Sequence, residues 1–345
     1  MIPLIQLAWE SERWQQHLQS AFRTTADLLD YLGTNIDGDW EPDGFPILVP
    51  RSFAERMIPG DPLDPLLRQV VGHVDETIKT PGFTHDPLAE QTAATGDSTA
   101  LLQKYAHRAL LVATSGCAVN CRYCFRRHFP YHNHRDKHFA DTLSQIGADT
   151  SLEEIILSGG DPLILPDPQL GSLLESLDAI QHIQRIRIHT RLPIVLPQRV
   201  TQELVKIFES LQAKLTVVLH VNHANELDGQ TASGIAAMRS AGGWILNQSV
   251  LLRGVNDNGP TQVALSKRLF EQDVLPYYLH LPDRVQGTAH FSVAEHEADT
   301  IFQYMQAHLP GYLVPRLVRE VPDQPNKVLF ADLDTVEQNS RVNHE

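Results

Sequence analysis

The chain has 345 residues, of which 42% are hydrophobic, so it can bury one large core with or without a smaller appendage. Its formal charge of −14 would repel phosphate backbones, which argues against nucleic acid as a partner. No stretch approaches the roughly 20 consecutive apolar residues of a membrane-spanning helix, and the first residues lack the basic and apolar regions of a secretion signal. We therefore expect a globular cytoplasmic protein with no membrane partner.

The first hundred residues are predicted to form a helical extension and a wrapping segment. Apolar positions recur at helical spacing over residues 11–32, whereas residues 40–53 and 80–97 are rich in Pro, Gly and Asp. We place the start of the main domain near Leu101. The predicted division is residues 1–100 for the extension, 101–310 for the main domain and 311–345 for a C-terminal segment.

Beyond Leu101, short apolar or β-branched runs alternate with longer amphipathic stretches. This rhythm predicts strands at 109–114, 154–157, 185–189, 215–220, 244–249 and 276–280, and helices at 137–147, 168–180, 201–211, 231–241, 260–271 and 294–309. Such βα units in series imply an α/β fold with a parallel sheet, either a partial TIM-type barrel or an open doubly wound sheet. In both folds the chemistry belongs at the C-terminal ends of the strands.

All three cysteines, Cys117, Cys121 and Cys124, fall within eight residues directly after the first of these strands. Disulfides would join distant segments, so the thiols are expected to act together. Three thiolates can hold an iron–sulfur cubane that leaves one iron open to a ligand. The alternatives are a zinc site completed by His128, His132, His134 or His138, although structural zinc sites usually present two separated ligand pairs, or three free structural thiols.

The C-x3-C-x2-C spacing, with Tyr123 before the last cysteine, resembles the radical SAM superfamily. The resemblance implies a [4Fe-4S] cluster on the three cysteines, S-adenosylmethionine on the open iron, and a partial (βα)6 TIM-type barrel with an N-terminal helical extension. Ser158, Gly159, Gly160 and Asp161 follow the second strand, where that superfamily has a Gly-Gly-Glu-like element for the amino group of S-adenosylmethionine. Glycine amides could meet a ligand there, although alone this sequence is equally an ordinary tight turn.

Further runs, at 124–127, 187–191, 247–257 and 276–278, resemble the lysine 2,3-aminomutases. Members of that family are isomerases that move an amino group from Cα to Cβ with the help of pyridoxal phosphate, whose imine nitrogen can bridge both carbons. Lys327, in the C-terminal segment, matches the family's Schiff-base lysine, although Pro-Asp-Gln-Pro-Asn replaces the glycines before it. Without the resemblance it would be an ordinary surface lysine. Arg108 and Gln248 match residues near the pyridoxal cofactor.

The resemblance also implies lysine as the substrate. Arg126 matches the residue that binds the substrate carboxylate, and its planar fork suits a bidentate contact. Asp283 and Glu320 match two carboxylates that bind the ε-ammonium, with Glu320 in place of an Asp. Leaving that ammonium buried and unpaired would be costly. Taken alone, Asp283 would be a loop carboxylate and Arg126 an ordinary basic residue beside an anionic cluster.

The sequence ends eighteen residues after Lys327, as in the short branch of the family that converts (S)-α-lysine to (R)-β-lysine for elongation factor P. This similarity implies a functional link to elongation factor P and its β-lysine ligase, a reductant such as flavodoxin, and a possible homo-oligomer. Two alternatives stay open: a lysine 2,3-aminomutase of another pathway, and a zinc-organised binding protein without catalysis.

Overall fold

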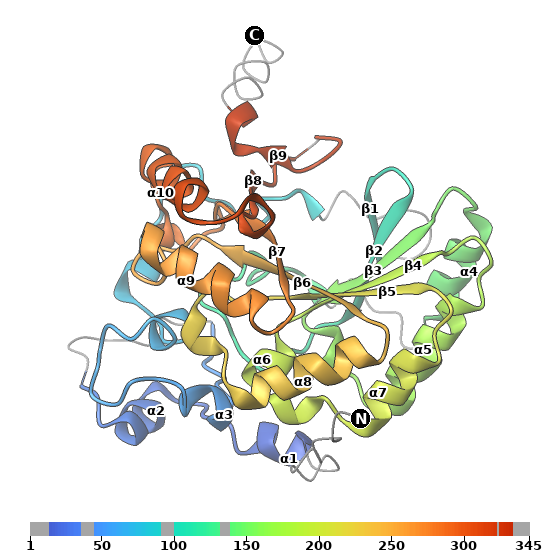
Figure 1. Cartoon of the computed structure of the whole chain (residues 1–345), viewed down its shortest axis with the longest axis horizontal. Helices are drawn as coiled ribbons and strands as arrows, with labels where there is room; N and C mark the ends of the chain where they lie inside the picture. Colours follow the sequence, from blue (N-terminus) through green and yellow to red (C-terminus); the bar gives the residue numbers. More distant parts are fainter. Residues whose placement is uncertain (1–13, 36–44, 91–99, 132–138, 323, 334–345) are drawn as a thin grey trace.

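A nine-stranded sheet organises the chain, and each strand pairs with the next in sequence order (Figure 1). The computed structural model describes residues 14–35, 45–90, 100–131, 139–322 and 324–333. Strands β2 to β8 are parallel, whereas β1 and β9 pair antiparallel at the two edges. The strands are β1 (Leu101–Tyr105), β2 (Arg108–Thr114), β3 (Glu154–Gly159), β4 (Arg185–Thr190), β5 (Lys214–Leu219), β6 (Trp244–Val250), β7 (Leu275–His280), β8 (Arg316–Arg319) and β9 (Val328–Leu329).

One long helix follows each strand from β2 to β7, which confirms the predicted partial (βα)6 barrel. These helices are α4 (Ala140–Ala148), α5 (Asp167–Asp178), α7 (Gln202–Glu209), α8 (Gly229–Ser240), α9 (Gly259–Phe270) and α10 (Glu295–His308), with a short α6 (Leu192–Val195) before α7. Figure 1 shows α5, α7 and α8 along the outer side of the curved sheet. In the part of the chain that the structure describes, β1 and β9 have no partner on their outer edges, so the sheet is not closed there.

The alternation of side chains along β4 shows how the sheet separates its core from its cavity. Ile186 and Ile188 are fully buried in the hydrophobic core. The intervening Arg187 and His189 line a cavity inside the sheet. A strand with a period of two therefore packs against helices on one side and presents polar groups on the other.

Two helices lie in the part of the N-terminal extension where apolar positions recur at helical spacing. Residues 14–32 form two helices, α1 (Trp14–Gln19) and α2 (Thr25–Leu32), and residues 11–13 lie outside the described part. The break has a local cause, because the Thr24 side chain caps α2 by accepting a hydrogen bond from the amide of Asp27 at 3.1 Å. Phe22, between the helices, forms a β-bridge with Val49.

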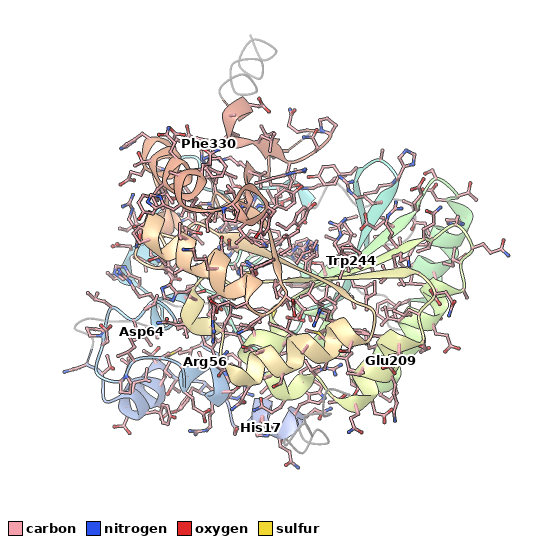
Figure 2. The ribbon with its side chains drawn as sticks, viewed as in Figure 1. His17, Arg56, Asp64, Glu209, Trp244 and Phe330 are labelled. Carbon is pink, nitrogen blue, oxygen red and sulfur yellow. The ribbon has the colours of Figure 1, made fainter. Side chains whose placement is uncertain are left out.

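The extension packs onto the barrel and shares its core. A third short helix, α3 (Arg51–Ala54), precedes Arg56, which is labelled in Figure 2 and donates hydrogen bonds to the carbonyls of Ile194 and Glu226 on the barrel. Portions of the predicted loop segments, residues 40–44 and 91–97, are outside the described ranges. Among the helices of the described ranges, none is long and apolar enough to cross a membrane.

Candidate active site

A cavity of about 670 Å³ lies inside the curved sheet and brings together nearly all of the predicted site residues. Its wall combines inward-facing strand residues with the loops that follow the strands. The predicted residues that line it are Cys117, Cys121, Cys124, Arg108, Arg126, Ser158, Gly159, Gly160, Gln248, Asp283, Glu320 and Lys327. Asp161 is not part of the wall. Residues up to 219 positions apart in sequence, Arg108 and Lys327, thus meet in one place.

The N-terminal extension fixes the cysteine loop that follows β2. The amide of Arg122 donates to the carbonyl of Gln69 at 2.9 Å, and the amide of Asn120 donates to the carbonyl of Leu48 at 3.1 Å. The buried guanidinium of Arg122 is paired with Glu76. The extension therefore acts as a clamp on the loop that carries the thiols.

The three thiols are free and are suited to a cluster. Burial and neighbouring thiols raise the pKa of Cys117 above its usual value and that of Cys124 to about 11, so binding of iron would displace protons. Within the described residues, no three His, Cys, Asp or Glu side chains are arranged to hold one metal ion. Ligands of a single zinc would have to lie about 3.8 Å apart, whereas cubane thiolates bind different irons and stand further apart.

The histidines proposed for a zinc site do not join the thiols. His128 lies outside the cavity wall, stacks on His85 and has its Nε2 atom 3.0 Å from the carbonyl of Gln286. His132, His134 and His138 lie outside the described residues. Nothing in the described part therefore completes a zinc site.

The glycine pair at the end of β3 is required by the close approach of β2 and the loop after it. A Cβ atom on Gly159 would lie 2.5 Å from the carbonyl oxygen of Thr114, and one on Gly160 would lie 2.1 Å from that of Gly116. The amide of Gly160 donates to Thr114 at 2.7 Å. The expectation that this amide is free to meet a ligand is therefore wrong. Gly159 and Gly160 still line the cavity, so a contact with S-adenosylmethionine stays a prediction.

The Asp161 carboxylate forms hydrogen bonds within the protein. Its carboxylate accepts hydrogen bonds from the Thr190 hydroxyl at 2.7 Å and from the amides of Leu163, Arg191 and Leu192 at 3.0, 2.7 and 2.9 Å. Its own amide donates to Gly116. The side chain thus joins the loop after β3 to the end of β4, and the backbone amide adds the loop after β2. Asp161 does not line the cavity, so this geometry does not support its predicted contact with S-adenosylmethionine.

Arg126 has a partner that the sequence did not reveal. Its Nε and Nη2 atoms donate to the two carboxylate oxygens of Glu90, both at 2.7 Å, and its Nη1 donates to Ser158 Oγ at 3.0 Å and to the Gly159 carbonyl at 3.1 Å. Burial raises the pKa of Glu90, but the Arg126 guanidinium outweighs it and lowers the pKa overall. A bidentate contact between this fork and a substrate carboxylate is therefore not open in this arrangement.

Lys327 and Glu320 form an ion pair at the open side of the barrel. Lys327 Nζ donates to one oxygen of Glu320, and the hydroxyl of Tyr105 donates to the other. Because Tyr105 ends β1 and Glu320 follows β8, this contact spans the gap between the two sides of the barrel. Arg108 stacks on the ring of Tyr105, with its guanidinium carbon 4.6 Å from the centroid.

Asp283 faces the same cavity without such partners. Its carboxylate makes no hydrogen bond with any residue of the described part of the chain. Burial and the nearby Glu320 raise its pKa to about 7. A half-buried carboxylate with no hydrogen-bond partner in the described residues is suited to a cationic ligand.

Two histidines in the wall were missed from the sequence. His189 on β4 and His280 on β7 both line the cavity, and the buried Nε2 atom of each has no hydrogen-bond partner among the described residues. Burial lowers the pKa of both, that of His280 to about 3, so both imidazoles are neutral. Both histidines are the last residues of predicted strands, where chemistry is expected. The alternation along each strand also places them on the side that faces the cavity, so the sequence could have indicated them. Such orphaned nitrogens beside Lys327 fit a polar cofactor such as pyridoxal phosphate.

Comparisons with known proteins define the class first: residues 111–264 match the family model of the Radical SAM superfamily. The L-lysine 2,3-aminomutase of Escherichia coli (strain K12) is 50% identical over 285 residues, covering 82% of each chain. That of Haemophilus influenzae (strain ATCC 51907 / DSM 11121 / KW20 / Rd) is 42% identical over 330 residues, covering 94% of this chain and 97% of that protein. That of Clostridium subterminale is 29% identical, covering 95% and 81%.

The chain belongs to the radical SAM lysine 2,3-aminomutase family. Its members are isomerases that use a [4Fe-4S] cluster, S-adenosylmethionine and pyridoxal phosphate. Family membership therefore decides between the cluster and the zinc site in favour of the cluster.

Proposed function

We propose that this chain is a lysine 2,3-aminomutase that converts (S)-α-lysine to (R)-β-lysine. The observation that supports it is the composition of one cavity wall, in which three free thiols, the amine of Lys327 and the carboxylate of Asp283 meet. A radical source, an anchor for a carbonyl cofactor and a site for a distant ammonium are the parts that this reaction needs.

Different residues of the cavity wall are proposed to bind the cluster, S-adenosylmethionine and pyridoxal phosphate. Cys117, Cys121 and Cys124 would hold the cluster, with Ser158, Gly159 and Gly160 beside the adenosylmethionine that it binds. Lys327 would hold pyridoxal phosphate, with Arg108 and Gln248 around it. When bound, these groups supply a carbon-centred radical that removes hydrogen from the substrate and a conjugated system on which the nitrogen migrates.

In this proposal Glu320 accepts a proton from Lys327. The Glu320 carboxylate accepts a hydrogen bond from Lys327 Nζ and so holds the amine in the cavity wall. A protonated amine is not a nucleophile, so Lys327 must release a proton before it can react with a carbonyl. Glu320 Oε2 is placed to take that proton, while Tyr105 continues to hold Oε1.

Asp283 is expected to bind the ε-ammonium of the substrate, and the Asp283→Asn variant tests this. Only the ionised carboxylate attracts the ammonium, which stays protonated up to about pH 10. Because the pKa of Asp283 is raised to about 7, kcat/KM for lysine should fall as the pH drops through about 7. The variant should raise the KM for lysine by about 10- to 100-fold. The variant should also abolish the fall of kcat/KM at low pH. If that fall is unchanged in the variant, another group causes it.

Glu90 is expected to act as a positioning residue for Arg126. Breaking a buried ion pair is costly, so the pair stays intact and Arg126 offers the substrate carboxylate the remaining N–H of Nη2. Glu90→Gln should loosen the guanidinium and raise the KM for lysine about tenfold with little change in kcat. Glu90→Asp should restore part of the loss. A lower KM in Glu90→Gln would instead identify Glu90 as a competitor that the substrate must displace.

We further propose that the protein works in the cytoplasm, is reduced by a flavodoxin-like protein, can form homo-oligomers, and supplies β-lysine for elongation factor P. The resemblance of Glu320 and of the glycine-poor loop before Lys327 to that branch of the family supports this link. The test offers the reconstituted enzyme, with dithionite and S-adenosylmethionine, either free (S)-lysine or elongation factor P that already carries α-lysine. Chiral chromatography should give (R)-β-lysine from the free amino acid. If only the attached lysine is converted, the aminomutase acts after the ligase has attached α-lysine to elongation factor P.

A further inference from the structure

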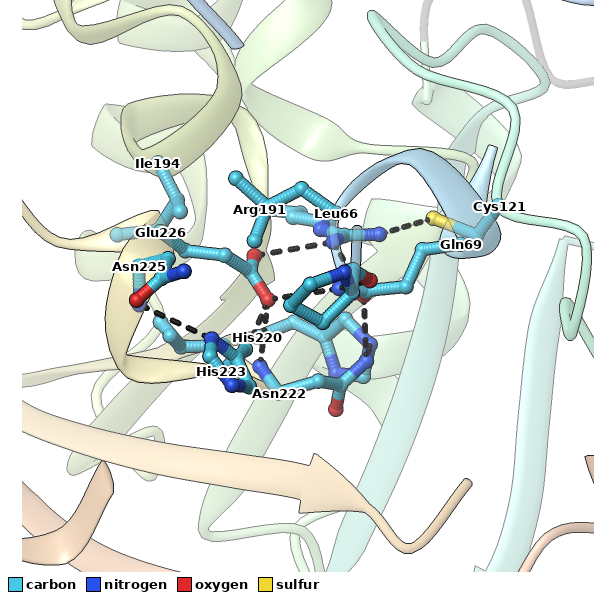
Figure 3. A network of polar contacts seen from close by, with 12 residues as sticks. Leu66, Gln69, Cys121, Arg191, Ile194, His220, Asn222, His223, Asn225 and Glu226 are labelled. Atoms are coloured by element: carbon cyan, nitrogen blue, oxygen red, sulfur yellow. Dashed lines mark hydrogen bonds and ion pairs between the residues drawn. The ribbon is translucent and has the colours of Figure 1, made fainter. Parts of the chain in front are cut away.

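A buried polar network lies against Cys121 and centres on Arg191, just beyond the end of β4 (Figure 3). Arg191 Nη1 donates to the sulfur of Cys121 at 2.8 Å and to the hydroxyl of Tyr123 at 2.7 Å. Nη2 donates to Gln69 Oε1 at 2.7 Å and to Glu226 Oε2 at 3.0 Å. The side chains of Arg191 and Glu226 are only 6% and 0% exposed, so solvent barely screens these charges.

The network fixes the guanidinium from the side opposite the sulfur. Glu226 Oε1 accepts hydrogen bonds from the amide of Asn222 at 2.9 Å and from Gln69 Nε2 at 3.2 Å. The side-chain amide of Asn222 in turn donates to Gln69 Oε1 at 3.0 Å and to Tyr123 at 2.7 Å. The extension and the loops after β4 and β5 thus hold the one cationic group of this network against a thiol proposed to bind iron.

We propose that Arg191 is a positioning residue that raises the reduction potential of the cluster through its hydrogen bond to Cys121. This inference rests on the proposed cluster at the three cysteines. Hydrogen bonds to cluster sulfurs and nearby charges are among the factors that set such potentials. A one-electron reduction adds negative charge to the cluster, and a fixed cation 2.8 Å from a ligand sulfur stabilises the reduced form more than the oxidised form. Glu226 opposes part of this effect because it is an anion.

A purely structural brace between the extension and the barrel is the competing explanation. The two explanations differ in the sign of their charge effects. If Arg191 tunes the cluster, Glu226→Gln should raise the potential because an anion is removed while the cation stays. The double variant Arg191→Gln with Glu226→Gln should lower it, and the second substitution prevents a buried unpaired carboxylate. A brace predicts changes in thermal stability in both variants but no shift of opposite sign in potential.

The experiment is a potentiometric titration of the reconstituted proteins, reduced by dithionite and followed by EPR without lysine or S-adenosylmethionine. At a fixed solution potential, the ratio of reduced to oxidised cluster in the double variant should be about tenfold lower than in the unmodified protein. In Glu226→Gln it should be higher. An unchanged potential in the double variant would overturn the proposal. If that variant does not retain iron, an unchanged or lower potential in Glu226→Gln would overturn it equally.

Failure of the proposed function has a different signature. If the unmodified protein binds no iron and sulfide, the proposed cluster is wrong. If the cluster forms and the variants shift its potential as expected but lysine is not converted, only the proposed aminomutase reaction is wrong.

Discussion

A Lys327→Ala variant is expected to lose covalent pyridoxal phosphate and to reduce aminomutase activity by about 10³-fold or more, because the substitution removes the amine proposed to anchor the cofactor. The fold should survive, because Glu320 keeps its hydrogen bond from Tyr105 when the amine is removed. The measurement is reduction with borohydride followed by peptide mapping. In the unmodified protein the pyridoxyl label should lie on Lys327.

Lys104 is the matched control for this experiment. It lines the same cavity, and its Nζ donates to the carbonyl of Leu88 at 2.6 Å. A Lys104→Gln variant should still be labelled at Lys327. A label on Lys104 in the unmodified protein, or one that persists in Lys327→Ala, would contradict the assignment of the cofactor lysine.

A Cys117→Ala variant should retain its fold but fail to hold a complete cluster, and the aminomutase activity should fall by at least about 10³-fold. Each thiolate of a three-cysteine cubane binds a different iron, so the loss of one ligand cannot be shared by the others. Iron and sulfide analysis after anaerobic reconstitution measures the effect. Ser115→Ala, an exposed position on the same loop, is the control and should load normally. Full iron and sulfide content in Cys117→Ala would show that Cys117 is not a ligand.

The barrel could be predicted from sequence because its signals are local. Alternation along β4 and helical spacing in the segments between strands each depend on neighbouring residues. The cysteine motif is also local, within eight residues. The strands that were not predicted, β1, β8 and β9, are edge or late strands of two to five residues, and their pairing depends on the sheet already being formed.

The contacts that tune the site could not be predicted in the same way. Arg126 and Glu90 are 36 residues apart, and Arg191 and Cys121 are 70 residues apart, so each pair exists only once distant parts of the chain have folded together. The glycine pair illustrates a related error. Gly159 and Gly160 have the predicted position, but their small size serves the packing of β3 against the loop after β2.

Whether the cluster loop and Lys327 act on one substrate is tested most directly with (S)-lysine that carries deuterium at C3. If the cluster loop and Lys327 serve one substrate in one cavity, deuterium from C3 should appear at C2 of β-lysine and at the 5′ carbon of recovered S-adenosylmethionine. Mass spectrometry and NMR of both compounds measure this transfer. Formation of β-lysine with no deuterium in S-adenosylmethionine, or consumption of S-adenosylmethionine without β-lysine, would contradict the account.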